Sequence, residues 1–187
     1  NQDDDGVSLS LDQTRAAHYF YYEKAIESSM RIVSFMEDEE VGHASGNYFK
    51  IGYHKFVITA AHVVTGQEVL YAEDYREKVE LEVVYVDTTN DIAFLLPKKD
   101  LKSVRAISYR TNKELDIMGT TMVYAGYPAD MNKSVFHGTV ATQSRYSFIM
   151  QSFALPGASG SAVFDNKGRV VGVLSAVKMG MYEISPF

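Results

Sequence analysis

The sequence contains no cysteine among its 187 residues. Disulfides, thiolate zinc sites and a cysteine nucleophile are therefore excluded. This absence does not decide the compartment, because a chain without cysteine folds in an oxidising or a reducing environment. No spacing of His, Asp and Glu suggests a catalytic metal, and no cofactor is expected.

Long apolar runs and an excess of basic residues are also missing. No stretch reaches the about 18 consecutive apolar residues that a membrane-spanning helix needs, so we expect no membrane span. Lys and Arg number 18 against 24 Asp and Glu, which gives a net charge of −6. An acidic chain without a basic patch is not expected to bind nucleic acid.

The N-terminal residues carry no recognisable secretory signal. The chain begins with Asn1 rather than Met, which suggests that preceding residues, such as a signal or pro-segment, were removed or are not included. We leave the compartment open, with a soluble extracellular or periplasmic protein favoured over a cytoplasmic one.

Apolar residues make up 46% of the chain, enough for a packed core in one domain or in two small barrels that share a core. Ser10 and Gln13 fit a capping box, and helix formers dominate from there to about Ser29. Tyr19-Phe20-Tyr21-Tyr22 places aromatics around much of this helix. The helix either packs on the domain or forms a homo-oligomer contact, since one face cannot bury four consecutive rings.

After residue 30 the pattern changes to short strands separated by turn signals, with almost no helix. This spacing is typical of an all-β barrel or sandwich. A polar, lysine-containing segment over residues 98–116 divides the strands into two halves. The expected strands cover residues 31–35, 46–50, 55–59, 69–72, 79–86, 92–96, 122–125, 134–141, 147–151, 161–164 and 170–176.

One serine near the C-terminal end lies between two glycines and other small residues, in Pro156-Gly157-Ala158-Ser159-Gly160. The glycines allow backbone angles that other residues resist. Such a turn can present a hydroxyl next to bare N–H groups, which are the nucleophile and the oxyanion hole of acyl transfer. A Gly/Ser turn into a strand explains the same pattern equally well when it stands alone.

Two further stretches raise the specificity of this pattern. An apolar strand runs into Thr59-Ala60-Ala61-His62, and Asp91 directly precedes the apolar segment Ile92-Ala93-Phe94-Leu95. Ser159, His62 and Asp91 are the residue types of a nucleophile, a general base and its orienting acid. They follow one another as His, Asp, Ser, with gaps of 29 and 68 residues, and this is one of the known chain orders of the triad.

These three stretches resemble the signatures of the trypsin-like, chymotrypsin-fold serine proteases. Segments such as Tyr124-Ala125-Gly126-Tyr127-Pro128 and Gly172-Val173-Leu174-Ser175-Ala176 are similar to the HtrA/DegP-type branch. The resemblance covers about residues 30–178 and includes no PDZ domain. It implies one protease domain over residues 1–187, built of two six-stranded antiparallel β-barrels with an N-terminal helix.

Within that domain, about residues 1–29 form the N-terminal extension and helix. The first barrel spans about residues 30–100, and the second about 116–187.

The resemblance also implies roles for individual residues. His62, Asp91 and Ser159 are the expected catalytic residues, and the N–H groups of Gly157 and Ser159 the expected oxyanion hole. Ser175 matches a position whose hydroxyl supports the aspartate. Ser161 stands where the family usually has glycine, and we expect its small side chain to leave the turn intact.

The resemblance further implies a substrate pocket floored near Phe153 and walled near Ala176 and Val177. This shallow apolar pocket is suited to small or medium apolar P1 side chains of a protein or peptide substrate. Alternatively, His137 occupies the pocket, as a histidine does in some Glu- or Gln-specific relatives.

The expected function is a serine endopeptidase. The alternative is a peptide-binding or assembly protein that has the protease fold but is latent or inactive. The two differ in whether the loop that carries Gly157 is ordered for catalysis.

Overall fold

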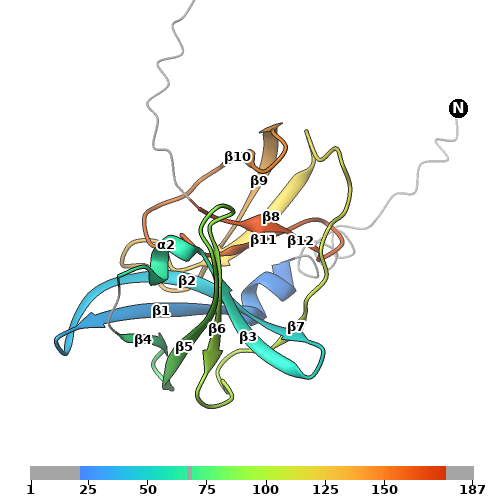
Figure 1. Ribbon diagram of the computed structural model, residues 1–187. Coiled ribbons are helices and arrows are strands. Elements are labelled where there is room, and N and C mark those ends of the chain that lie inside the picture. Colours follow the sequence, from blue (N-terminus) through green and yellow to red (C-terminus); the bar gives the residue numbers. More distant parts are fainter. Residues whose placement is uncertain (1–21, 67–68, 176–187) are drawn as a thin grey trace, which may run out of the picture.

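The chain forms two β-sheet units that lie against each other (Figure 1). The structure, a computed structural model, describes residues 22–66 and 69–175. Its helical segments are residues 22–28 and α2 (Ala61–Val64). Its strands are β1 (Ser29–Met36), β2 (Glu39–Ile51), β3 (His54–Thr59), β4 (Val69–Glu73), β5 (Lys78–Asp87), β6 (Ile92–Pro97), β7 (Ile107–Ser108), β8 (Thr121–Gly126), β9 (Ser134–Gln143), β10 (Phe148–Ser152), β11 (Ala162–Phe164) and β12 (Val170–Val173).

The first unit is a closed six-stranded barrel. Its strands pair in the order β1-β4-β5-β6-β3-β2, and the additional pairing of β1 with β2 closes the ring. Alternating side chains of these strands point inward and form the barrel core. That core contains Met30, Ile32, Tyr48, Val57, Leu70, Leu81 and Leu95. The short strand β7 adds to the outside of β2 in parallel.

The second unit is a curled sheet in the order β10-β9-β8-β11-β12. Its concave side encloses a separate core that includes Met122, Tyr124, Val140 and Val163. The all-β, chymotrypsin-like class expected from the sequence is confirmed. The described residues supply five strands to this unit, so it forms a half-barrel next to the closed first barrel.

A third core joins the two units. It contains Phe49 and Ile58 from the first barrel together with Ala125, Ala162 and Phe164 from the second sheet. Because apolar side chains of both sheets share this cluster, separating the units would expose it to water.

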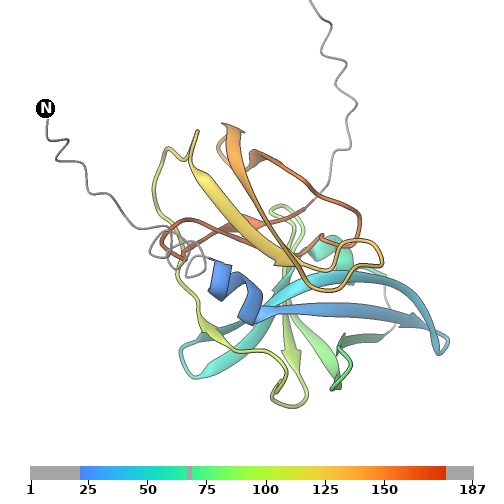
Figure 2. The same ribbon diagram turned by 180° about the vertical axis from the view of Figure 1, so that it is seen from behind.

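The helix over residues 22–28 also lies at this junction (Figure 2). Ala25 is fully buried in the shared core. The last carbonyls of the helix accept hydrogen bonds from Lys133 Nζ, at Ile26, and from the Arg105 N–H, at Glu27. The expected capping box and most of the aromatic run lie outside the described residues, so the oligomer interpretation stays a prediction. In the described part of the chain, no helix is long and apolar enough to cross a membrane.

Two short elements, α2 and β7, were not expected from the sequence. Strand β7 interrupts the polar connecting segment because Ile107 is buried in the shared core. Between β1 and β2, only Glu37 and Asp38 form the turn, with φ values of 51° and 66°. Strand β2 begins directly after them, and its Glu40 accepts a hydrogen bond from Arg31 of β1 at 2.8 Å.

Asn47 links the two units at the centre of the junction, and we predict that its loss is costly. Its amide donates to Ser28 Oγ at 2.9 Å and accepts from the Ala162 N–H at 2.8 Å, and it is fully buried. Asn47→Ala leaves a buried N–H without an acceptor, so it should lower the free energy of unfolding by about 1–3 kcal/mol. The measurement is urea denaturation. The exposed Asn132 provides the control, since Asn132→Ala should change stability by less than about 0.5 kcal/mol, and equal losses in both variants would contradict the prediction.

Candidate active site

Strand pairing brings His62 and Asp91 together. Strands β3 and β6 are antiparallel, with Thr59 opposite Ala93. The residues that follow β3 and those that precede β6 therefore leave the sheet at the same end. His62 lies on α2, just after β3, and Asp91 lies just before β6. The His62 N–H donates to Asp91 Oδ1 at 2.8 Å, and His62 Nδ1 lies 2.7 Å from Asp91 Oδ2.

Asp91 is held in a constrained position and in its ionised form. Its φ of 55° is in the left-handed region, which costs energy for a residue other than glycine. Partial burial would raise the pKa of its carboxyl. Hydrogen bonds from the Ser175 hydroxyl, the His62 ring and the His62 N–H outweigh this effect, so the pKa of Asp91 lies below its usual value.

Ser159 lies in a tight turn before β11, in contact with the first barrel. Gly157 and Gly160 have φ values of 101° and 93°, which only glycine adopts readily. A Cβ on Gly160 would lie 2.1 Å from both Ser45 O and Thr59 Oγ1. The Ser161 hydroxyl donates to Ala158 O at 2.7 Å, so this departure from the family pattern closes the turn.

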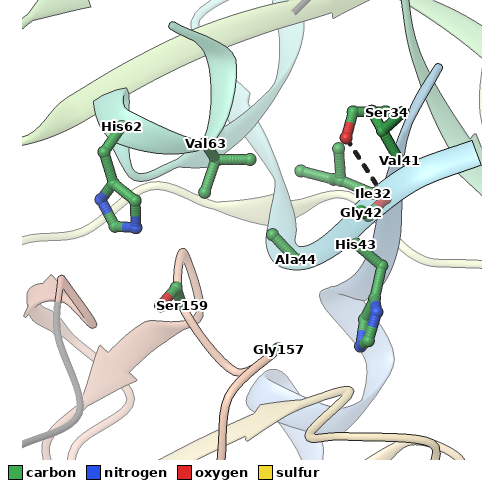
Figure 3. Close-up of a pocket in the computed structure, with 10 residues that line it drawn as sticks. All are labelled: Ile32, Ser34, Val41, Gly42, His43, Ala44, His62, Val63, Gly157 and Ser159. Carbon is green, nitrogen blue, oxygen red and sulfur yellow. Dashed lines mark hydrogen bonds between the residues drawn. The ribbon is translucent and has the colours of Figure 1, made fainter. Parts of the chain in front are cut away.

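His62 and Ser159 face one cavity from opposite units (Figure 3). The His62 imidazole is about half exposed, with 51% of its side chain accessible, and it points toward the serine. Among the described residues, no hydrogen bond joins Ser159 Oγ to the His62 ring. A serine hydroxyl rotates freely, and catalytic hydrogen bonds are often long before substrate binds. The cavity is lined by Ile32, Ser34, Val41, Gly42, His43, Ala44, His62, Val63, Gly157 and Ser159.

The backbone N–H groups of Gly157 and Ser159 are the candidate oxyanion donors. Within the part of the chain that the structure describes, neither the Gly157 nor the Ser159 N–H donates a hydrogen bond. The carbonyl of Pro156 accepts from the Ala129 N–H at 2.5 Å. In a trans peptide the N–H points opposite to the C=O, so the Gly157 N–H points away from Ala129. Both residues that carry these free donors line the cavity.

The residues expected to form the substrate pocket are only partly accounted for. Ala176 and Val177 lie outside the described residues. Phe153 is 63% exposed, and its ring lies 5.8 Å from that of Phe136. It does not line the cavity next to Ser159. His137, the alternative pocket residue, is exposed, and its ring lies 6.4 Å from that of Tyr22.

Sequence reasoning missed His43 and Ser45 on β2. His43 Nε2 lies 3.1 Å from Tyr127 O, and the Ser45 hydroxyl donates to Gly157 O at 2.9 Å. Neither residue lies in a catalytic motif, so their sequence gave no signal beyond that of an ordinary strand. In the described residues, no three His, Asp or Glu side chains converge as a metal site requires.

The model of the trypsin-like peptidase domain matches residues 44–173, which span the three residues of the site. The chain belongs to this family. A probable periplasmic DegP-like serine endoprotease of Halomonas elongata is 28% identical over 141 residues, covering 71% of this chain and 29% of that protein. A Staphylococcus epidermidis HtrA-like serine protease is also 28% identical, over 79% of this chain and 28% of that protein. This trypsin-like domain is thus of the HtrA/DegP type, and the chain spans less than a third of the length of these relatives.

Solved structures share the trypsin-like fold. The inactive form of the Rv3671c protease superposes with a TM-score of 0.71 at 20% identity, covering 88% of this chain and 85% of that one. Deg5 superposes with a TM-score of 0.70 at 19% identity, covering 90% of this chain and 88% of that one. At this level of identity the superpositions establish the fold alone.

Ser175→Ala should raise the pKa of Asp91, because the variant removes a hydrogen bond to the carboxylate and leaves its burial. A depressed carboxyl pKa gives stability that is present above the unfolded-state pKa, about 3.9 for Asp, and is lost as the pH falls through the folded-state pKa. The variant should therefore lose more stability at pH 7 than at pH 2. The measurements are a carboxyl ¹³C titration of Asp91 and denaturation at both pH values, and an unchanged Asp91 titration would contradict the prediction.

Proposed function

We propose that this domain is a serine endopeptidase that uses Ser159 as nucleophile, His62 as general base and Asp91 as the acid that orients the histidine. The observation that carries the proposal is the pair of hydrogen bonds that fixes His62 on Asp91. Opposite it lies Ser159, where the Gly157 and Ser159 N–H groups have no acceptor among the described residues. The HtrA/DegP-type relatives support it, since their names describe serine proteases.

The hydrogen bonds define which ring nitrogen acts as the base. A carboxylate only accepts hydrogen bonds, so His62 Nδ1 carries the proton that faces Asp91 Oδ2. The lone pair of the neutral ring is then on Nε2, the nitrogen available to Ser159. As Ser159 Oγ attacks the peptide carbonyl, Nε2 takes the hydroxyl proton and later transfers it to the leaving amine. Asp91 stays ionised, which stabilises the imidazolium between these two steps.

The carbonyl oxygen of the substrate gains negative charge when the carbon becomes tetrahedral. In the proposal, the N–H groups of Gly157 and Ser159 bind this oxygen. Each such donor contributes about 3–4 kcal/mol to the stability of the transition state. These donors have no acceptor in the described part of the chain, so no hydrogen bond within that part has to break before they bind the substrate oxygen.

The cavity fits the part of the substrate that follows the scissile bond. The leaving amine departs on the side of His62, which protonates it, and the cavity extends from His62 toward β1 and β2. We propose a protein or peptide substrate, with a small or medium apolar P1 side chain next to Phe153. The DegP-like relatives are named as periplasmic, which favours a periplasmic location for this chain.

A second candidate function is a latent, peptide-binding form of the same fold. The observation that favours it is the missing hydrogen bond between Ser159 and His62 in the described residues. In that case substrate or a partner would have to bring the two side chains together before turnover.

Labelling by a fluorophosphonate probe distinguishes the two functions. We predict stoichiometric labelling at neutral pH on Ser159 alone, located by mass spectrometry of peptides. Ser159→Ala should abolish labelling, and His62→Ala should slow it by about 10⁴-fold or more because the base is lost.

The neighbouring serine provides the matched control. Ser161 is buried, and its hydroxyl is used within the turn, so it should carry no label in either protein. A folded wild-type chain that binds peptides but is not labelled would contradict the endopeptidase and support the latent form.

Cleavage of a peptide library tests the substrate pocket. We predict a preference for Ala, Val and similar P1 residues, and Phe153→Ala should broaden it toward larger apolar side chains because the ring no longer limits the pocket. Tyr53→Ala, at a fully exposed aromatic in the β2–β3 turn, is the control and should leave the profile unchanged. A preference for Glu or Gln would instead support His137 as the pocket residue.

A further inference from the structure

We infer that Ser45 is a positioning residue that holds the nucleophile turn and the oxyanion donors in place from the other barrel. This inference rests on the proposed function, because it assigns how the same site is kept in its active geometry. Ser45 lies on β2, is fully buried and does not line the cavity next to Ser159, so its role is exerted through Gly157 and Ser159.

Ser45 makes hydrogen bonds to the backbone carbonyl groups of both Gly157 and Ser159. Its N–H donates to Ser159 O at 2.9 Å, and its hydroxyl donates to Gly157 O at 2.9 Å. The carbonyl groups thus held belong to the two residues whose own N–H groups are the proposed oxyanion donors. One residue of the first barrel therefore fixes the backbone on both sides of Ala158.

The peptide planes on both sides of Gly157 are fixed by these contacts. Ala129 binds the carbonyl of the plane before Gly157, at Pro156 O, and Ser45 binds the carbonyl of the plane after it. With both planes fixed, the direction of the Gly157 N–H is determined. This matters because a glycine at φ 101° has no side chain that would restrict its rotation.

A hydrogen bond from Tyr127 defines the orientation of the Ser45 hydroxyl. Ser45 Oγ accepts the Tyr127 N–H at 2.9 Å, so its single proton is directed to Gly157 O. The Tyr127 carbonyl is contacted in turn by His43 Nε2 at 3.1 Å. Tyr127 and Ala129 belong to one connection after β8, so Ser45 and this connection support the turn together.

The backbone of the second unit approaches Ser45 closely at two glycines. A Cβ on Gly126 would lie 2.9 Å from Ser45 Oγ, and one on Gly160 would lie 2.1 Å from Ser45 O. Two glycines are therefore required for the backbone of the second unit to approach Ser45 this closely.

The test compares Ser45→Ala with a matched buried serine. Ser29 is also fully buried on the first barrel, and its hydroxyl donates to a backbone carbonyl of the second unit, Ala125 O, at 3.1 Å. Ser45→Ala should reduce kcat by about 10- to 100-fold, because the peptide plane after Gly157 is no longer fixed and the two oxyanion donors lose their alignment, with little change in KM. Ser29→Ala should leave kcat within about twofold while it loses a hydrogen bond of the same kind.

A second readout separates positioning from a general loss of structure. A peptide aldehyde places its hemiacetal oxygen in the oxyanion hole, so Ser45→Ala should weaken its binding by the same factor as kcat/KM. The product peptide from the amine side of the cleaved bond places no oxygen in the oxyanion hole, so it should bind unchanged. Ser45→Cys, with a thiol that donates weakly, should give an intermediate loss and serves as the second variant if Ser45→Ala does not fold.

The inference is overturned if Ser45→Ala and Ser45→Cys, folded by amide NMR spectra, keep wild-type kcat and aldehyde affinity. It is also overturned if Ser29→Ala loses as much activity. If the fluorophosphonate probe does not react with the wild-type chain, the proposed function is refuted instead. The ¹⁵N–¹H resonance of Gly157 still tests the positioning role in that case. That resonance should shift in Ser45→Ala and stay in place in Ser29→Ala, and no shift in Ser45→Ala would count against the role of Ser45.

Discussion

Direct contact between the nucleophile turn and strand β2 is the constraint on which the rest of this site depends. The backbone at Gly160 lies so close to Ser45 O and Thr59 Oγ1 that no side chain fits between them. His62 follows β3, and β3 pairs with β2, so the same contact sets how far the histidine is from the serine. A displacement of one unit against the other would change the nucleophile–base distance and the donor directions at the same time.

Much of the fold and of the candidate site could be predicted because both depend on local patterns. Short apolar strands separated by turns indicated the two sheets. The predicted strand ends were wrong mostly where charged residues such as Glu39 extend an exposed strand. The family resemblance predicted that His62, Asp91 and Ser159 lie together in one site. Strand pairing then accounts for the proximity of His62 to Asp91, since Thr59 lies opposite Ala93.

Contacts between distant backbones could not be predicted in this way. The role of Ser45 depends on carbonyl groups more than 100 residues away, and a serine within a strand has no pattern that indicates such partners. The short helix α2 was missed because four residues give no helical periodicity. The face of the sheet on which His137 lies depends on the register of β9. A register shift of one residue would move its side chain to the other face.

Several hydrogen-bonded links cross the junction close to Ser159. Ser45 reaches Gly157 and Ser159, Asn47 reaches the Ala162 N–H, and Ser175 of the second unit donates to Asp91 of the first. The links through Ser45 and Asn47 bury polar groups that would be costly to leave unpaired, so the two units dock in one arrangement rather than in several. The same arrangement places the proposed base, its carboxylate and the proposed oxyanion donors. Loosening the junction should therefore reduce catalysis before either unit unfolds, because local opening requires less free energy than global unfolding.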